Sequence, residues 1–180
     1  MPVRAAVELE LGYPVLERVL AQQVFTQEGR KYVRGSKDTK CSFAYLESPR
    51  LGAEKGQIRM NARFSGRSAL DLLGRCIGLG DSFELTILAT PTYKEGWLLL
   101  SNVRIGTPAR QTYYVRRVIQ ALTEELPRTF QYSIAEDARR ILEQPRDPNY
   151  RQELTGFGVS AIQVTPAALV LTLDFHLAVK

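Results

Sequence analysis

The sequence has little of the chemistry on which metal binding depends. Its 180 residues contain one histidine and two cysteines, Cys41 and Cys76. Two cysteines this far apart do not make a zinc site, and Cys-x-x-Cys, His-x-x-x-His and Asp-x-Asp motifs are absent. The cysteines could pair in an oxidising compartment or remain two free buried thiols, and the sequence does not decide between the two. No metal and no cofactor are predicted.

Candidate catalytic groups are equally few. The single histidine, His176, falls on the polar face of the last predicted strand beside Asp174, with no nucleophile identified next to it. The glycines of the segment Gly74-x-x-x-Gly78-x-Gly80 match neither the dinucleotide fingerprint nor a phosphate-binding loop. The sequence therefore predicts a protein that is not an enzyme, and an enzyme using His176 with Asp174 ranks last among the alternatives.

Long apolar runs are also missing. The longest has five residues, 167–171, whereas about 20 are needed to cross a bilayer. The first residues lack the apolar segment of a signal peptide, so either the protein stays inside the cell or a leader is absent from this chain. The hydrophobic content of 44% and charged content of 24% exclude a disordered chain. We expect a single domain, 1–180.

Positive charge is concentrated in one part of the chain. The net charge is +5, and residues 28–67 contain ten Lys or Arg against four Asp or Glu. This stretch could contact phosphates of lipid or nucleic acid, or it could be the solvated face of a sheet. Tyr32, Phe43 and Tyr45 lie in it and could stack on bases. Phe43 and Tyr45 share a face with Cys41 and are expected in the core, so nucleic acid is disfavoured.

The hydrophobic pattern predicts an antiparallel α+β protein. Alternation is clearest in residues 57–65, where Ile58, Met60, Ala62 and Phe64 share one face. Residues 68–77 are expected to form a short helix or a bulged crossing between strands. The other predicted strands are residues 5–11, 41–47, 82–90, 97–105, 159–165 and 168–179.

Three segments have helical spacing. Residues 14–27 predict a short amphipathic helix, and residues 133–142 predict another. The longest pattern, residues 111–126, places Val115, Ile119, Leu122 and Leu126 in one apolar stripe. Pro127 is expected to end this helix, because its ring clashes with the preceding turn.

The order of these elements resembles a known family. The long helix is followed by Pro127, a short strand at residues 130–132, a second helix and a closing hairpin of residues 157–164 and 169–173. This order resembles the bacterial envelope branch of the tubular lipid-binding (TULIP) superfamily. The resemblance implies a strongly curved antiparallel sheet wrapped around a long amphipathic helix, with one or two shorter helices. It also implies non-enzymatic binding of an apolar ligand between helix and sheet, and a location in the periplasm or cell envelope.

These expectations assign the candidate site residues. A groove between helix and sheet would bind a lipid or fatty acid, since a sixteen-carbon chain gains on the order of 12 kcal/mol gross on leaving water. Arginines on the polar face of the strand at residues 57–65, and just beyond it, would favour anionic headgroups or an anionic membrane surface: Arg59, Arg63 and Arg67. The predicted apolar lining consists of Leu16, Val19, Leu20, Ile58, Met60, Phe64, Leu85, Ile87, Leu99, Val115, Ile119 and Leu122.

A second hypothesis explains the same pattern without a ligand. The apolar faces of helix and sheet could close completely on each other. The protein would then be an interaction or scaffold module with a solid core, and its partner would be another protein.

Overall fold

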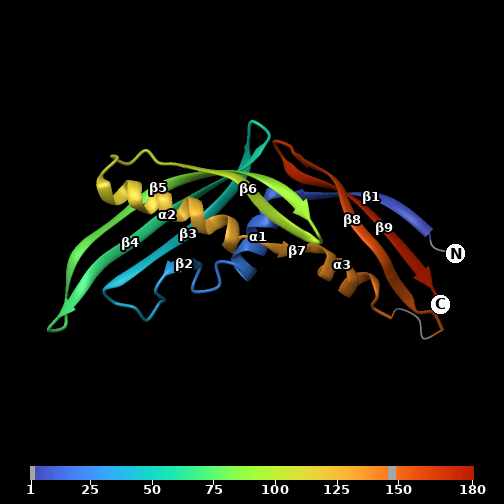
Figure 1. The fold of residues 1–180 in the computed structure, drawn as a ribbon, viewed down its shortest axis with the longest axis horizontal. Helices are drawn as coiled ribbons and strands as arrows, with labels where there is room; N and C mark the ends of the chain where they lie inside the picture. Colours follow the sequence, from blue (N-terminus) through green and yellow to red (C-terminus); the bar gives the residue numbers. More distant parts are fainter. Residues whose placement is uncertain (1–2, 146–148) are drawn as a thin grey trace.

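The computed structural model describes residues 3–145 and 149–180, which form two antiparallel sheets and three helices (Figure 1). The strands are β1 (Val3–Gly12), β2 (Arg30–Arg34), β3 (Ser42–Glu54), β4 (Gln57–Leu72), β5 (Arg75–Lys94), β6 (Trp97–Gly106), β7 (Tyr132–Ser133), β8 (Gln152–Val164) and β9 (Ala168–Val179). The helices are α1 (Tyr13–Gln23), α2 (Tyr113–Thr129) and α3 (Ile134–Leu142). Within the described ranges, no helix is long and apolar enough to cross a bilayer.

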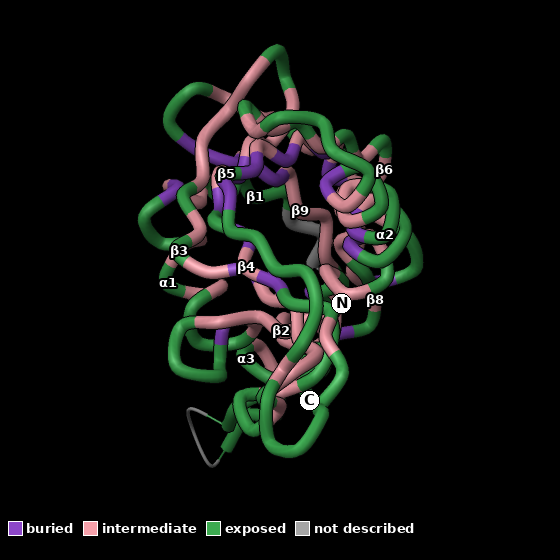
Figure 2. The backbone as a smooth tube through the Cα atoms, turned by 90° about the vertical axis from the view of Figure 1, so that its left-hand side faces the viewer, coloured by how far each residue is buried: buried purple, intermediate pink, exposed green. Residues whose placement is uncertain are grey.

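The two sheets differ in size. The larger one has the strand order β2-β3-β4-β5-β6-β7, and the smaller one has the order β1-β9-β8. Neighbours in the larger sheet follow one another along the chain, so its strands are joined by local turns and by the segment that contains α2. The larger sheet curls strongly, as the end-on view shows (Figure 2). The prediction of an antiparallel, strongly curved sheet is therefore confirmed.

The predicted α+β fold, with this sheet wrapped around a long amphipathic helix, is wrong. Most of the described chain is strand, and the three helices are short, with 11, 17 and 9 residues. At 1.5 Å per residue α2 is about 25 Å long, whereas the 20 residues of β5 extend over roughly 65 Å. A helix of that length covers only part of the sheet, so the strands dominate the fold.

Two local predictions are also wrong. Residues 68–77 are neither a helix nor a crossing, because they form the end of a hairpin in which β4 and β5 pair without interruption from Ile58 and Ala89 to Leu72 and Arg75. Pro127 lies inside α2 and does not end it. The helix continues to Thr129, and its last turn closes because the amide of Phe130 still donates to the carbonyl of Leu126 (2.9 Å).

Two hydrophobic clusters hold the sheets and helices together. In the first, Val115, Leu122 and Leu126 of α2 pack against the inner face of the larger sheet, where Phe64 and Leu85 are each 1% exposed. The second cluster lies on the smaller sheet. Its buried members are Ile134, Leu169 and Leu171, and partly buried residues of α1, β1, β4, β5, β6, β8 and β9 pack around them.

One disulfide connects distant parts of the larger sheet. Cys41, which directly precedes β3, is bonded to Cys76 in β5, with a Cα–Cα distance of 5.1 Å. The neighbouring pairs Ser42–Ser68 and Asp71–Cys76 show that β4 lies between the two half-cystines. Of the two states that the sequence left open for the cysteines, the structure therefore has the paired one.

Removing this disulfide should destabilise the fold. Cross-links 35 residues apart in sequence reduce the entropy of the unfolded chain by an amount equivalent to about 4 kcal/mol. We therefore expect the double substitution Cys41→Ser, Cys76→Ser to lower the free energy of unfolding by up to this amount in chemical denaturation. A double variant as stable as the oxidised parent protein would contradict the assignment.

A tyrosine in β7 gives the stability a pH dependence. Burial, together with the hydrogen bond that Tyr132 donates to the carboxylate of Asp137, raises the pKa of this tyrosine to about 12. Because folding favours the protonated phenol, this contribution is complete below the ordinary pKa of 10.0 and is lost as the pH rises to about 12. We expect the loss of stability between these pH values to be smaller in Tyr132→Phe than in the parent protein, as measured by thermal melts. Identical losses would contradict this role.

Candidate functional site

The apolar inner face of β4 and β5 continues beyond the part that is buried. Residues paired directly across antiparallel strands point to the same side, so the buried pair Phe64–Phe83 shares its face with Leu70–Ile77 further along. Burial on this face ends at Gly66. Beyond it the pairs are exposed, although they remain largely aliphatic.

The start of α2 marks the end of the covered region. A Cβ atom added to Gly66 would lie 2.8 Å from the hydroxyl oxygen of Tyr114, so this side chain from the first turn of the helix lies over the glycine. Burial, with a smaller contribution from Asp81, raises the pKa of Tyr114. Its neutral hydroxyl and the exposed Asp81 separate the core from the apolar end of the hairpin.

Five aliphatic side chains are exposed at this end. Their exposed fractions are 53% for Leu72, 59% for Ile77, 72% for both Leu70 and Leu79, and 104% for Leu73. We call these five residues the hairpin site. In the end-on view this end of the hairpin is exposed over almost its whole length (Figure 2), and in Figure 1 it projects at the left past the start of β3. Clustered aliphatic exposure of this kind is typical of a binding surface.

The turn of the hairpin site departs from the usual turn chemistry. Leu73 and Gly74 both have positive φ values, 54° and 77°, as a two-residue type I′ turn requires. Two other hairpins in the sheet close in the same way, with Lys55–Gly56 and Glu95–Gly96. In those turns the first residue is charged, whereas here it is a leucine whose side chain is fully exposed. Folding therefore gives no reason for leucine at this position.

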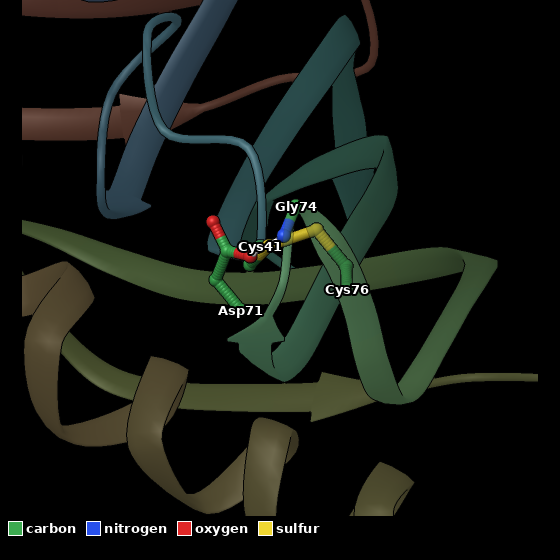
Figure 3. The surroundings of a disulfide bond; sticks show 4 residues. All are labelled: Cys41, Asp71, Gly74 and Cys76. Carbon is green, nitrogen blue, oxygen red and sulfur yellow. Dashed lines mark hydrogen bonds between the residues drawn. A yellow bond between two sulfur atoms is a disulfide. The ribbon is translucent and has the colours of Figure 1, made fainter.

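The outer face of the hairpin is fastened by polar and covalent bonds (Figure 3). Asp71 accepts a hydrogen bond from the amide of Gly74 through Oδ1 (2.9 Å), which stabilises the turn. Cys76, which lies between Arg75 and Ile77 in the sequence, forms the disulfide with Cys41. The hairpin thus presents aliphatic side chains on one face while its other face is tied to the rest of the sheet.

Most of the residues predicted to line a groove lie in the two clusters. Those buried in the first cluster are Met60, Phe64, Leu85, Ile87, Val115 and Leu122, with Leu20 and Ile119 packed partly buried against it. Leu16 and Ile58 pack against the second cluster. Val19 and Leu99 are half-buried and belong to neither. The structure therefore brings these residues together mainly as packing partners.

The three predicted headgroup arginines lie four residues apart on the outer face of β4. Arg59 is half-buried, and its Nη1 lies 3.9 Å from the carboxylate of Glu54. Its Nε is buried and has no hydrogen-bond partner among residues 3–145 and 149–180. Arg63 donates from Nε to Ser82 (2.9 Å). Only Arg67, opposite Gly80, lies near the hairpin site. The three side chains are therefore not equivalent, and one of them adjoins the exposed apolar surface.

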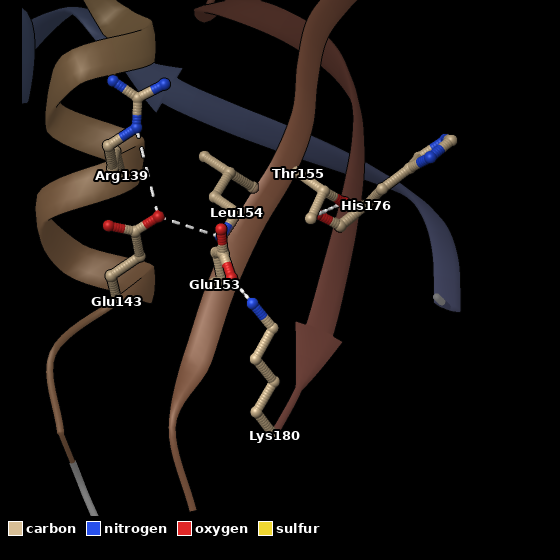
Figure 4. Close-up of polar contacts among 7 residues, drawn as sticks. All are labelled: Arg139, Glu143, Glu153, Leu154, Thr155, His176 and Lys180. Carbon is tan, nitrogen blue, oxygen red and sulfur yellow. Dashed lines mark hydrogen bonds and ion pairs between the residues drawn. The ribbon is translucent and has the colours of Figure 1, made fainter. Parts of the chain in front are cut away.

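The charged groups near the ends of β8 and β9 are used in structure (Figure 4). Glu143 lies 4.0 Å from Arg139 and accepts the amide hydrogen of Leu154 (2.9 Å). Lys180 lies 2.5 Å from Glu153 and lowers the pKa of that carboxyl by hydrogen bonding. A polar cleft of about 590 Å³ lies here, lined by Arg139, Glu143, Arg151, Gln152, Glu153, Leu154 and Lys180.

His176, the residue of the enzyme alternative, is exposed, and its ring points away from this cleft (Figure 4). Its backbone carbonyl accepts a hydrogen bond from Thr155 (3.2 Å), whereas its imidazole makes none with the part of the chain that the structure describes. Within that same part, no three His, Cys, Asp or Glu side chains are grouped so that they could hold a metal ion.

The hairpin site was missed by the sequence analysis. A signal for it exists, because Leu70, Leu72, Ile77 and Leu79 alternate with other residues on both sides of a Leu-Gly pair. Ala69, Leu70, Leu73 and Cys76 also fit helical spacing, which favoured the wrong interpretation. Comparison of the chain with protein-family models, with curated proteins and with solved structures found no match.

The cost of the unusual turn residue is measurable. A non-glycine residue in the left-handed region costs about 1 kcal/mol or more, and asparagine tolerates it better than leucine. Since Leu73 is fully exposed, we expect Leu73→Asn to raise the free energy of unfolding by about 0.5–1 kcal/mol in chemical denaturation. A destabilised Leu73→Asn variant would mean that this side chain packs within the fold.

Proposed function

We propose that this protein binds lipid without catalysis, by inserting the hairpin site among the acyl chains at a membrane surface. The observation that supports this most strongly is Leu73, a fully exposed leucine in a left-handed turn position, at the end of a largely aliphatic hairpin face. A residue that breaks local preference without a structural gain is best explained by a binding role.

The size of the apolar surface fits reversible membrane association. Complete burial of one leucine or isoleucine side chain is worth about 1.5–3 kcal/mol. Five such side chains that are already 53–104% exposed would gain on the order of 5–10 kcal/mol gross, before the cost of immobilising the protein at the surface. This resembles the marginal binding given by a single acyl anchor, which needs a second attractive contribution to become stable.

The groups around the hairpin site favour a membrane as the occupant. Arg67 and Arg75 lie on β4 and β5 beside the aliphatic residues, and both are exposed. Aliphatic side chains flanked by cations are typical of proteins that lie at the interface of an anionic bilayer. A projecting hairpin can enter that interface without any rearrangement of the core.

The core itself favours a second candidate. Val115, Leu122 and Leu126 are at most 2% exposed against the inner sheet face, which agrees with an interaction module whose interior is packed solid. In that case the hairpin site would dock onto a protein. The ligand groove between helix and sheet implied by the TULIP resemblance stays a proposal, and most of the residues named for it are those of the two clusters.

The disulfide bears on the proposed location. Disulfides persist in oxidising compartments, such as the bacterial periplasm, and are rare where thiols are kept reduced. The Cys41–Cys76 bond therefore supports a location in the periplasm or cell envelope as part of this proposal.

Vesicle flotation tests the proposed function. Leu70 and Ile77 form a cross-strand pair, so Leu70→Ser with Ile77→Ser removes the centre of the hairpin site and should weaken binding to phosphatidylcholine vesicles by about tenfold or more. Val15→Ser with Ile141→Ser changes two residues of similar exposure on α1 and α3 and should leave binding within about twofold.

Two outcomes would contradict the proposal. The parent protein would fail to float with any vesicle, or the hairpin variant would bind as well as the control. In the first case, capture of a protein partner that depends on Leu70 and Ile77 would favour the interaction module.

A further inference from the structure

A short basic loop is held against the outer side of the hairpin. Residues 35–41, which we call the basic loop, connect β2 to β3 and include Lys37 and Lys40, with Asp38 between them. The loop is a defined turn: the amide of Ser36 donates to the hydroxyl of Thr39 (3.0 Å), and the amide of Thr39 donates to the carbonyl of Ser36 (3.0 Å). Both lysines are exposed.

The disulfide fixes where this loop lies. Its last residue, Cys41, is bonded to Cys76, which neighbours Ile77 of the hairpin site. The next residue of the chain, Ser42, pairs with Ser68, two positions before Leu70. The basic loop therefore ends at the level where the exposed aliphatic residues begin, on the opposite face of the strands.

The cations in this region have no carboxylate partners. None of the ion pairs formed within residues 3–145 and 149–180 includes Lys37, Lys40, Arg67 or Arg75. Two of the nearby carboxylates are engaged instead with backbone amides, Asp71 with that of Gly74 and Asp81 with that of Ser82. These four cations adjoin an apolar surface whose five side chains carry no charge.

We propose that the basic loop is the headgroup-binding part of the hairpin site and that it selects anionic phospholipids. This inference rests on the proposed lipid binding and names the lipid class. When the aliphatic residues enter the acyl region, the loop lies beside the point of entry, at the depth of the phosphates and carboxylates of the headgroups. The lysines then supply the second attraction that an apolar hairpin of this size needs.

The preference for anionic headgroups depends on the position of the basic loop and not on the net charge alone. Cys41 and Cys76 hold the loop beside the hairpin. The lysines therefore reach the headgroups with a smaller loss of conformational entropy than they would from a free segment. Opening this bond leaves every cation in the protein but removes the covalent attachment of the loop.

The experiment compares flotation with vesicles of phosphatidylcholine alone and of phosphatidylcholine mixed with phosphatidylserine. The parent protein should prefer the mixed vesicles. Each basic residue near an anionic surface strengthens binding by about fivefold, so Lys37→Gln with Lys40→Gln should reduce this preference by about tenfold or more. The matched control, Lys55→Gln with Lys94→Gln, removes the same charge from exposed lysines at two other hairpin turns and should keep the preference within about twofold.

A third variant tests the disulfide. Cys41→Ser with Cys76→Ser should lose several-fold of the preference for phosphatidylserine while it keeps its binding to phosphatidylcholine. An unchanged preference in this variant would overturn the role assigned to the disulfide.

The outcomes separate this inference from the function on which it depends. A parent protein that binds neither vesicle refutes the proposed function and the inference together. A parent protein that binds both vesicles equally, or loop and control variants with the same preference, overturns the inference alone.

Discussion

A mismatch in length between strands and helix determines this structure. β4 and β5 pair continuously over roughly 50 Å, the length of the 16 residues of β4, and their inner face is largely apolar on both sides of the Gly66–Asp81 pair. The 17 residues of α2 rise about 25 Å. The helix therefore buries the part of the face that contains Phe64 and Leu85, and it ends its cover at Gly66. The aliphatic residues beyond that point remain exposed.

The exposed end is nevertheless well fixed. Asp71 stabilises the turn, and the disulfide attaches the hairpin to the start of β3. An isolated two-stranded hairpin is marginal in water, so these bonds supply the order that packing gives elsewhere in the sheet. Leu73 adds a conformational cost at the same place. Bonds that rigidify the hairpin and a residue that weakens its turn therefore occur together at its exposed end.

The sequence predicted the regular parts of the molecule and not the exceptional ones. The alternation of Ile58, Met60 and Phe64 correctly identified a half-buried strand, because one face of that strand is covered as the pattern requires. The end of the hairpin was missed because its aliphatic residues fit a helical spacing as well as an alternating one. The Leu73–Gly74 turn also lacks the Asn or Asp that usually marks a type I′ turn.

The pairing of the cysteines and the part of the sheet that α2 covers both depend on contacts between residues far apart in the sequence, which no local pattern contains. The spacing of Cys41 and Cys76 could not show that they are bonded, whereas the register of β3, β4 and β5 brings them together. The spacing of Val115 and Leu122 predicts a helical stripe, but it does not show how much of the sheet a helix of this length covers. The residues assigned to a lipid groove were therefore largely core residues, and of the assigned arginines only Arg67 adjoins the hairpin site.

The depth of Leu73 in a bilayer tests the account most directly. The chain contains one tryptophan, Trp97, so Leu73→Trp in a Trp97→Phe background reports from the turn alone. We expect its emission to shift to the blue on addition of vesicles and to be quenched by lipids brominated on their acyl chains. Ile141→Trp in the same background should show neither change. An emission spectrum of the Leu73→Trp protein that is unaffected by vesicles would contradict insertion of the hairpin.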